Sequence, residues 1–304
     1  QGDTITSLLK EFKECFQSPL EKLAAAKVKP VEIKLKNDIP IRVGMYRYSK
    51  AEKEIISKEV KEMLEAGIIE KSKSPYSASV VLVPKKDGEK RFCVDYQRMN
   101  ENTIDFPYPM SKIEEILDDL GKANFFSVID LKSGYWQLPL AEESKEKTAF
   151  TTHEGHFQFV RMPFGLKNAP SEFCAAMDEV YQDLKFIRRY MDDIVIFSNS
   201  EEEHMGHLRI FLERTKQYNL TLNLKKCKFC CQEISLLGYR ISPGKIELLE
   251  DKVDVIRSWP IPKSVSELRT FLGLTGTYRR FIKNYAEKTL CLNELLKKNA
   301  KWSW

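Results

Sequence analysis

Apolar residues follow two patterns along this chain, the two-residue repeat of strands and the wider spacing of amphipathic helices. Short β-type runs predict strands at 79–84, 91–96, 125–130, 135–140, 147–152, 156–160, 186–189 and 194–197. The pair Asp87-Gly88 predicts the turn that joins the first two of these strands into a hairpin. The stretch 31–41 is expected to be extended chain.

Helical spacing marks most of the remaining segments. Helices are expected at 5–16, from Ser49 to Gly67, between Ser111 and Gly121, from Pro170, after Ser200, and from about 247 onward. Four helix starts show Ser followed three residues later by Glu, the sequence of a capping box, with the pairs Ser49–Glu52, Ser111–Glu114, Ser200–Glu203 and Ser264–Glu267. The pattern predicts an α+β protein of antiparallel strands and covering helices, followed by an all-helical C-terminal region.

Two adjacent carboxylates, Asp192 and Asp193, lie between the apolar runs 186–189 and 194–197, and a third, Asp130, ends the run 125–129. Burying unpaired charge is strongly unfavourable, so such a pattern is tolerated where a positive group compensates it, and a divalent metal ion is the strongest local compensator. Three acids at strand ends could hold a pair of metal ions, which is the geometry of nucleotidyl transfer. The alternative is an exposed hairpin tip.

Length and composition bound the class of protein. With 304 residues, 42% of them hydrophobic, the chain can bury a large core, and two or three subdomains are expected. No apolar stretch approaches the roughly 20 residues that span a bilayer, and no signal-peptide pattern opens the chain. Residue 1 is Gln, so a processed or excised product is expected. Seven irregularly spaced cysteines fit a reduced intracellular protein better than a disulfide framework.

The net charge of +5 is unevenly distributed. From Lys252 to the last residue there are eleven basic and four acidic residues, whereas the preceding 251 residues carry 38 basic and 40 acidic ones. Positive charge gathered in one helical region is expected of a segment that lies along a phosphate backbone. A solvated helical face is the alternative.

Several motifs, in order along the chain, resemble one polymerase family. Residues 128–135 (Val-Ile-Asp-Leu-Lys-Ser-Gly-Tyr), 162–170 (Met-Pro-Phe-Gly-Leu-Lys-Asn-Ala-Pro) and 190–193 (Tyr-Met-Asp-Asp) are similar to the polymerase motifs of reverse transcriptases. Flanking matches are 74–77, 85–88, 94–96, 237–239, 271–274 and 278–282. Together they resemble the Ty3/gypsy class of long-terminal-repeat retrotransposons most closely, with retroviral enzymes as relatives, from about residue 11 to the end.

The resemblance implies a right-hand polymerase. Its implied parts are an N-terminal arm at 1–40, fingers at 41–103 and 141–163, a palm at 104–140 and 164–241, and a thumb at 242–304. The implied activity is that of an RNA-directed DNA polymerase, which extends a primer with deoxynucleoside triphosphates by two-metal nucleotidyl transfer on an RNA or DNA template. The implied cofactor is a pair of Mg²⁺ ions, with Mn²⁺ as a substitute.

The resemblance also assigns metal ligands. Asp130 and Asp192 would bind metal directly, the backbone carbonyl of Leu131 would assist, and Asp193 would be a supporting ligand. Without metal, three nearby carboxylates are expected to repel one another and to raise one another's pKa values.

Tyr135 follows Asp130 by five residues. An aromatic ring there can pack beneath the sugar and leave no space for a 2′-hydroxyl, which would select deoxynucleotides and disfavour an RNA polymerase; the alternative is a core tyrosine. In the family this position is the steric gate, and Ser133, Gly134 and Phe164 are assigned to nucleotide binding with it. Retroviral enzymes commonly have Gln at the position of Phe164, whereas Phe is usual in the Ty3/gypsy class.

A basic turn joins the first two predicted strands, with Lys85, Lys86, Lys90 and Arg91 around it. A basic hairpin can close over an incoming triphosphate, to which Arg offers a bidentate fork and Lys a point charge. A solvated turn is the alternative. By resemblance, Arg91 and a lysine, Lys85 or Lys90, contact the triphosphate.

Two further roles come from the resemblance. Lys225, in preference to Lys226, would protonate the departing pyrophosphate as a general acid, a surface lysine being the alternative. Leu237, Gly238 and Tyr239 match the hairpin that grips the primer end, where glycine lets the backbone approach the nucleic acid. The stretch 278–283 is expected to mix core and primer–template contacts.

His204-x-x-His207 and Cys227-x-x-Cys230 have the paired spacing of a zinc site. Zinc is not expected, because the two histidines lie three apart on a predicted helix whose apolar stripe already accounts for that segment.

The chain ends about where a ribonuclease H region would begin in this family, so polymerisation without degradation of template RNA is expected. A protease, ribonuclease H or integrase could have neighboured the chain in a polyprotein that acts in the cytoplasm or within virus-like particles, without a membrane. The alternative function is that of a catalytically silent, domesticated relative, a nucleic-acid-binding or structural subunit. The presence of Asp130, Asp192, Asp193 and Tyr135 counts against this alternative.

Overall fold

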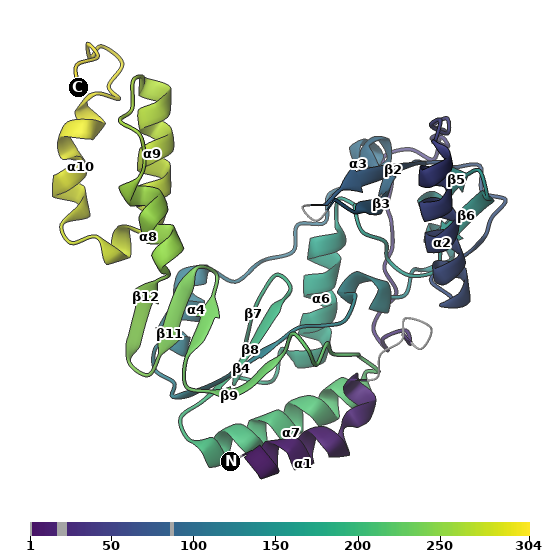
Figure 1. Ribbon diagram of the computed structural model, residues 1–304, viewed down its shortest axis with the longest axis horizontal. Helices are drawn as coiled ribbons and strands as arrows, with labels where there is room; N and C mark the ends of the chain where they lie inside the picture. Colours follow the sequence, from purple (N-terminus) through teal and green to yellow (C-terminus); the bar gives the residue numbers. More distant parts are fainter. Residues whose placement is uncertain (1, 17–22, 86–87) are drawn as a thin grey trace. The chain divides into compact units, whose positions relative to one another are not determined.

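The computed structural model describes residues 2–16, 23–85 and 88–304. The chain divides into two compact units: a first unit of Gln1–Asp118 with Asn124–Cys231, and a second unit of Asp119–Ala123 with Gln232–Trp304. Each unit has its own antiparallel strands and helices (Figure 1). Among the described residues, no helix is both long and apolar enough to cross a membrane. All seven cysteines are free thiols.

A four-stranded antiparallel sheet of the first unit carries the three predicted aspartates at or beside the ends of its strands. Its order is β7 (Ile187–Tyr190), β8 (Asp193–Ser198), β4 (Phe125–Ile129) and β9 (Lys228–Cys231). Helices α6 (Ala169–Tyr181) and α7 (Glu201–Gln217) pack together through the rings of Tyr181 and Phe211, which stack with 5.0 Å between centroids. Most side chains of β4 and β8 are buried, so the hydrophobic effect holds these two strands in place.

A second β-rich part of the first unit combines a hairpin with a three-stranded sheet. The hairpin pairs β2 (Ser79–Pro84) with β3 (Lys90–Asp95), and the sheet has the order β1 (Ile69–Lys71), β6 (Gly155–Phe159) and β5 (Phe150–Thr152). Helix α2 (Lys50–Glu65) packs there through buried Ile56 and Met63. The predicted capping box is confirmed, because Ser49 Oγ accepts the Glu52 N–H while the Glu52 carboxylate accepts the Ser49 N–H.

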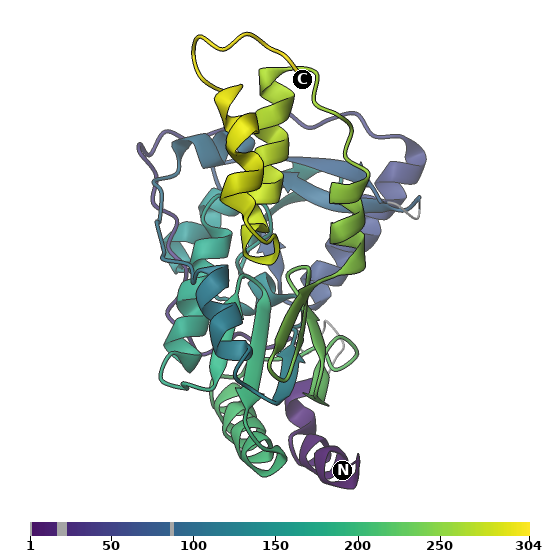
Figure 2. The same cartoon turned by 90° about the vertical axis from the view of Figure 1, so that its left-hand side faces the viewer.

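Shorter elements complete the first unit: α1 (Gly2–Glu11), the 3₁₀ turn η1 (Lys13–Phe16), α3 (Gln97–Asn102), η3 (Gly134–Gln137), α5 (Glu142–Lys145) and η4 (Glu146–Thr148). Helix α4 (Ile113–Leu120) leads from the first unit into the second. Figures 1 and 2 show α1 alongside α7, where Arg209 donates to both carboxylate oxygens of Glu11. Within the predicted extended stretch, single bridges pair Val31 with Leu140 and Leu35 with Thr103.

The second unit is a small sheet followed by helices. Its elements are β10 (Ile234–Leu236), β11 (Tyr239–Ser242), β12 (Lys245–Leu248), α8 (Glu250–Arg257), α9 (Val265–Thr277), the 3₁₀ turn η5 (Arg279–Phe281) and α10 (Tyr285–Glu294). The ring of Tyr239 contacts those of Tyr278 and Phe281, with 6.5 and 5.5 Å between centroids. These aromatic contacts join the sheet to the helical part.

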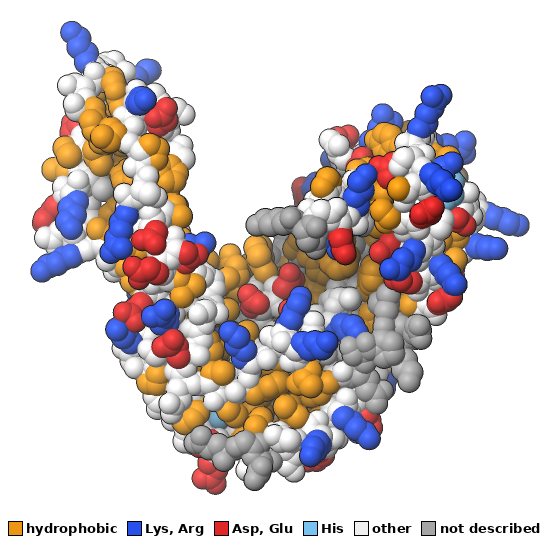
Figure 3. All heavy atoms as spheres, in the orientation of Figure 1, with side chains coloured by type: hydrophobic (Ala, Val, Ile, Leu, Met, Phe, Trp, Pro, Cys, Tyr) orange, Lys and Arg blue, Asp and Glu red, His pale blue; other side chains and the backbone are white. Residues whose placement is uncertain are grey.

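Basic side chains of the second unit remain at its surface. Arg279, Arg280 and Lys283 are exposed beside the half-buried rings of Tyr278 and Phe281. Figure 3 shows Lys and Arg side chains spread over the α9–α10 region with apolar side chains between them. The half-buried rings fit the expected core contacts of residues 278–283, and their contacts with primer–template stay a prediction.

The expected elements that differ from the structure have local causes. The predicted strand 135–140 is wrong: Ser133 adopts a left-handed conformation (φ 47°), and the chain turns into η3 instead. Helix α4 begins at Ile113, two residues after the predicted cap Ser111. The pattern of apolar residues predicts none of the strands β1, β9 and β12, since each has only three or four residues and too few positions to show a period. A hairpin at the place of β10 and β11 is expected only from the resemblance. The predicted turn residue Asp87 lies outside the described residues.

Candidate active site

The three predicted acids lie at one end of the central sheet. Strand β4 pairs with β8 so that Ile129 faces Ile194, which places Asp130 and Asp193, the next residues along each strand, at the same edge. Strands β7 and β8 are joined by the two-residue turn Met191-Asp192. Asp130, Asp192 and Asp193 are thus neighbours at this end of the sheet, which we call the acidic edge.

Met191 makes this hairpin turn in a strained conformation. Its φ of 50° lies in the left-handed region, which costs a residue with a Cβ on the order of 1–2 kcal/mol. Its side chain is nearly half exposed. Such strain persists only where the surrounding structure fixes the backbone, and here the paired strands on both sides of the turn do so.

Repulsion between carboxylates contributes to the raised pKa values of Asp130 and Asp193. Burial raises the pKa of Asp130, and the charge of Asp192 raises it further, against the lowering effects of the Lys226 charge and a hydrogen bond from Asn223. Burial, then Asp192 and Asp130, raise the pKa of Asp193. These two acids therefore behave as expected of carboxylates that lie near one another.

The donors at this sheet edge have the chemistry of a site for a hard divalent cation, since carboxylate and carbonyl oxygens are the ligands that Mg²⁺ and Mn²⁺ prefer. Burial is the main cause of the raised pKa values of Asp130 and Asp193, and the charge of Asp192 adds to both. Across residues 2–16, 23–85 and 88–304, no group of three His, Cys, Asp or Glu side chains is arranged so that it could hold a metal ion. The residue types at the acidic edge fit a hard divalent ion, but the three carboxylates do not form a ligand set in this structure.

The loop after β4 is held by a residue that the sequence analysis missed. Gln137 is fully buried; its amide donates to the carbonyls of Lys132 (2.6 Å) and Thr221 (2.8 Å) and accepts the Thr221 N–H (2.7 Å). Leu131 forms a β-bridge with Leu222 on the same segment. The available signal in the sequence is a polar residue, Gln137, within the apolar run 135–140. The strand predicted for that run does not account for it.

Tyr135 lies in this loop between two phenylalanine rings. Its ring centroid is 5.0 Å from that of Phe164 and 5.6 Å from that of Phe173. Burial raises the pKa of Tyr135 to about 12, with a contribution from the charge of Asp192, so the phenol is neutral and lies within electrostatic reach of the acidic edge. A Cβ at Gly134 would come within 2.9 Å of the Phe173 ring, so glycine is required for this packing.

Two asparagines hold the loop that presents Phe164. Asn100 donates to the Gly165 carbonyl (2.9 Å) and accepts the Lys167 N–H (2.8 Å). Asn168 donates to the Ile104 carbonyl (2.8 Å). Phe164 remains 53% exposed although it touches the rings of Tyr135 and Trp136, so part of this side chain is open to solvent beside Tyr135.

The predicted triphosphate-binding hairpin is formed, and its lysines have acidic partners. Lys90 lies 2.7 Å from Glu52, and Lys85 lies 3.0 Å from Glu89. Arg91 is exposed on β3, opposite Val83. Lys86 lies outside the described residues. Figure 1 shows the β2–β3 hairpin and the β7–β8 turn in different parts of the first unit.

The predicted general-acid region lies beside Asp130. The Asn223 N–H donates to the Asp130 carbonyl (2.8 Å), and the Asp130 N–H points to Cys227 Sγ at 3.4 Å. Lys226 is the lysine whose charge acts on the Asp130 carboxyl. Lys225 is exposed on the same turn. Of these two lysines, Lys226 is therefore the one whose charge acts on the carboxylate of Asp130.

The predicted primer grip forms the β10–β11 turn of the second unit. Leu237 and Gly238 both have positive φ values, 53° and 84°, and the Gly238 carbonyl accepts the Leu249 N–H (3.0 Å). A Cβ at Gly238 would lie 3.2 Å from Cε of Lys252. A tight, glycine-dependent turn at the predicted place is consistent with close approach of another backbone.

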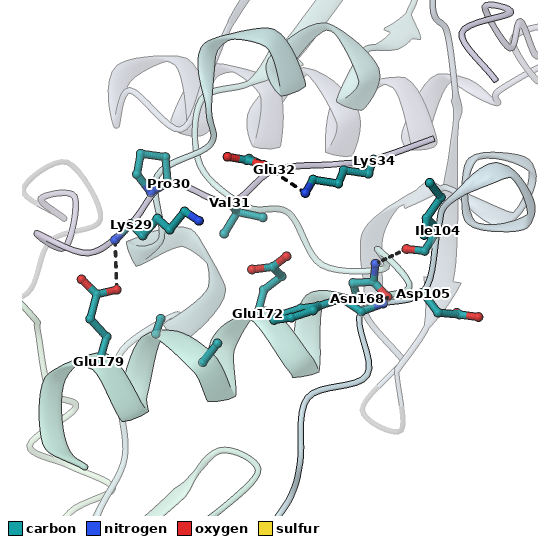
Figure 4. Close-up of a pocket in the computed structure, with 13 residues that line it drawn as sticks. Lys29, Pro30, Val31, Glu32, Lys34, Ile104, Asp105, Asn168, Glu172 and Glu179 are labelled. Carbon is teal, nitrogen blue, oxygen red and sulfur yellow. Dashed lines mark hydrogen bonds and ion pairs between the residues drawn. The ribbon is translucent and has the colours of Figure 1, made fainter. Parts of the chain in front are cut away.

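A pocket of about 410 Å³ lies elsewhere in the first unit, between residues 29–34, the loop at 104–106 and α6 (Figure 4). Figure 4 shows Glu172 pointing into it. Burial and the charge of Glu32 raise the pKa of Glu172 to about 7, against the opposite effect of Lys29 and Lys34. None of the three aspartates lines this pocket, so it is separate from the acidic edge.

Comparison with known proteins agrees with this geometry. Residues 83–241, more than half of the chain, match the family model described as reverse transcriptase (RNA-dependent DNA polymerase). The Pol polyprotein of transposon 297 from Drosophila melanogaster is 38% identical over 98% of this chain and 29% of its own length. That of transposon gypsy, from the same organism, is 35% identical over 96% of this chain and 30% of its own length. The chain thus spans less than a third of these relatives.

A solved structure shows the same fold. The foamy viral protease–reverse transcriptase dRH in complex with double-stranded DNA superposes with a TM-score of 0.83 at 26% identity, over 98% of this chain and 53% of that one. The predicted α+β polymerase fold is therefore confirmed. The chain belongs to the reverse transcriptase family of RNA-dependent DNA polymerases and resembles its gypsy-class retrotransposon members.

Proposed function

We propose that this chain extends a primer with deoxynucleotides on an RNA or DNA template. The observation that carries the proposal is the meeting of Asp130, Asp192 and Asp193 at one sheet edge, with the ring of Tyr135 within reach of the charge of Asp192. Hydrolases also use paired carboxylates, but an aromatic platform of Tyr135 and Phe164 beside them suits a nucleoside sugar and base.

Asp130 and Asp192, with the carbonyl of Leu131, would hold two Mg²⁺ ions or their Mn²⁺ substitutes, and Asp193 would support them. When bound, divalent ions lower the pKa of a primer 3′-hydroxyl and neutralise charge on the transferred phosphate. The backbone of this chain fixes where the ions would bind, since Asp130 and Asp193 lie at strand ends and Asp192 lies in a two-residue turn. Lys226 or Lys225 would supply a proton to the leaving pyrophosphate.

Tyr135 would act as the gate against ribonucleotides. Its ring is packed between Phe164 and Phe173, and Gly134 keeps the backbone close to Phe173. A ring fixed on both sides cannot move aside for an added 2′-hydroxyl without disturbing the core. Ser133 and Gly134 would offer backbone contacts to the same nucleotide.

The triphosphate would be bound by Arg91 with Lys85 or Lys90. In the structure Lys90 is held by Glu52, so its use requires exchange of a carboxylate partner for a phosphate. This exchange is inexpensive at an exposed pair, because surface ion pairs contribute about 0–1 kcal/mol.

The parts of the polymerase would lie at the ranges that the resemblance implies: the arm at 1–40, the fingers at 41–103 and 141–163, the palm at 104–140 and 164–241, and the thumb at 242–304. Leu237, Gly238 and Tyr239 would grip the primer. Support comes from the foamy viral relative, whose structure holds double-stranded DNA, and from the basic surface of residues 252–304. Relatives are polyproteins, so association with other Pol regions such as protease, ribonuclease H or integrase is part of the proposal, as is action in the cytoplasm or within virus-like particles.

Primer extension on an RNA template tests the proposal. The wild-type chain should extend a DNA primer with Mg²⁺ and deoxynucleotides, and Asp192→Asn should not, although its affinity for primer–template should be unchanged. Asp38→Asn, at an exposed acid away from the site, is the matched control and should extend normally. Salt-dependent binding without extension by the wild type would instead support the silent, nucleic-acid-binding alternative.

A further inference from the structure

A line of hydrogen bonds joins α7 to the two strands that carry the acids. Fully buried His204, on α7, has Nε2 2.7 Å from Ser127 Oγ on β4 and Nδ1 2.7 Å from Ser198 Oγ on β8. Ser198 Oγ also lies 2.7 Å from His207 Nδ1. The backbone N–H of Cys230, on β9, donates to Ser127 Oγ (3.0 Å). We call Ser127, His204, Ser198 and His207 the serine–histidine chain.

The direction of these hydrogen bonds follows from counting hydrogens, since each hydroxyl and each neutral imidazole has only one to donate. If Ser127 donates to His204 Nε2, then His204 Nδ1–H donates to Ser198, and Ser198 donates to His207 Nδ1. Every group is then satisfied. In the reverse direction Ser127 would accept from both Cys230 and His204, and its own hydrogen would lack an acceptor among the described residues. A buried unsatisfied group costs about 1–3 kcal/mol.

A carboxylate at the end of the serine–histidine chain favours the same direction. His207 Nε2 lies 3.9 Å from a carboxylate oxygen of Glu203. In the first direction a hydrogen on Nε2 faces this oxygen, whereas in the reverse direction two lone pairs would face each other. Burial, with help from His207 and against Glu203, lowers the pKa of His204 to about 4, so its ring is neutral near pH 7, as a single donated hydrogen requires.

We propose that His204 is a positioning residue which, as the neutral Nδ1–H tautomer, fixes the paired strands β4 and β8 to α7 and thereby steadies the strand ends beside Asp130 and Asp193. Ser127 lies three residues before Asp130 on the way to the acidic edge, and Ser198 ends the strand that Asp193 begins. One buried side chain thus ties both acid-bearing strands to the same helix. The catalytic consequence rests on the proposed function; the tautomer does not.

Nuclear magnetic resonance tests the tautomer directly. The chain has four histidines, so ¹⁵N-histidine labelling gives few signals, which His204→Gln and His207→Gln variants assign. At pH 7.5 His204 should carry its hydrogen on Nδ1. His156 is the internal control and should show the opposite tautomer, because its Nε2 lies 3.0 Å from the Ser74 carbonyl and must donate. A hydrogen on Nε2 of His204, or on both nitrogens, overturns the proposal whatever the activity.

Single-nucleotide incorporation by Ser127→Ala tests the positioning role, because this change removes the donor to His204 Nε2 together with the acceptor of the Cys230 N–H. The incorporation rate should fall on the order of tenfold, while affinities for nucleotide and primer–template stay within about twofold. Thr215→Val is the matched control: it removes a buried hydroxyl on α7 that bonds to Tyr181 and not to the serine–histidine chain, and it should leave the rate unchanged.

Equal losses in Ser127→Ala and Thr215→Val would show general loosening of the core and would overturn the positioning role, as would an unchanged rate in Ser127→Ala. A wild-type chain that binds primer–template without extending it would overturn the proposed function and its positioning consequence, whereas the resonance experiment would still decide the tautomer.

Discussion

Asp130 and Asp193 have raised pKa values because burial and neighbouring carboxylates penalise their ionised forms. When the folded-state pKa lies above the unfolded one, the group's contribution to stability is fully present below the unfolded pKa and is lost as the pH rises through the folded value. The metal-free protein should therefore lose stability from these residues as the pH rises above about 4. The acids are retained at a cost to stability.

Asp193→Asn tests this cost. In EDTA at pH 7.5 the variant should melt at a higher temperature than the wild type, because one repulsive charge is gone, and the difference should shrink toward pH 4. Added Mg²⁺ should raise the wild-type melting temperature more than that of the variant. Thermal unfolding followed by circular dichroism measures both effects. A variant that melts below the wild type in EDTA would mean that the Asp193 carboxylate stabilises the metal-free fold.

Tyr135→Val tests the gate. Removing the ring opens the space that a 2′-hydroxyl would need, so discrimination between dATP and ATP, measured as the ratio of their kcat/KM values, should fall on the order of a hundredfold. Tyr135→Phe keeps the ring and should keep the discrimination. Equal effects of both changes would assign the role to the phenol oxygen instead of the ring.

At the scale of elements, contiguous motifs could be predicted and long-range polar contacts could not. Asp130, Asp192 and Tyr135 each lie in a run of sequence whose local pattern signals its place. Gln137 and Asn100 hold the loops that present these residues, but their partners are backbone groups as many as 84 and 67 residues away. No periodicity reports such pairs, so the scaffold of the site could be seen only in the folded chain.

Gln137→Leu tests the scaffold. The change leaves the Thr221 N–H and the carbonyls of Thr221 and Lys132 without this buried partner, and the free energy of unfolding should fall by about 3 kcal/mol. Urea denaturation of the chain measures it. Gln217→Leu, at an exposed position of α7, should change stability by no more than about 0.5 kcal/mol. Similar values for the two variants would show that the Gln137 hydrogen bonds do not hold the loop.

At the scale of the whole chain, the proposed function draws on two units with different surfaces. The first unit carries the acidic edge and Tyr135, and the second carries the proposed primer-grip turn and a helical region in which basic residues outnumber acidic ones. The charge imbalance was evident in the sequence. The contacts of Tyr239 with Tyr278 and Phe281 were not, since they join segments about 40 residues apart.

Primer–template binding should depend steeply on salt if these cations contact phosphates. Arg279→Ala and Lys283→Ala should each reduce the slope of log K against log salt by about 1, as measured by fluorescence anisotropy with a labelled duplex. Lys10→Ala, at an exposed lysine of α1, is the control and should leave the slope unchanged. Unaltered slopes in the first two variants would place the phosphate contacts elsewhere.

The central claim is that carboxylates at the β4–β8 edge support metal-dependent nucleotidyl transfer, and single-turnover addition of one deoxynucleotide opposite an RNA template base tests it most directly. The wild-type chain should add the nucleotide with Mg²⁺ and not with EDTA, and Asp130→Asn should be slower by on the order of a thousandfold, with primer–template affinity unchanged. Addition by Asp130→Asn at the wild-type rate, or none by a wild-type chain that binds the duplex, would contradict the claim.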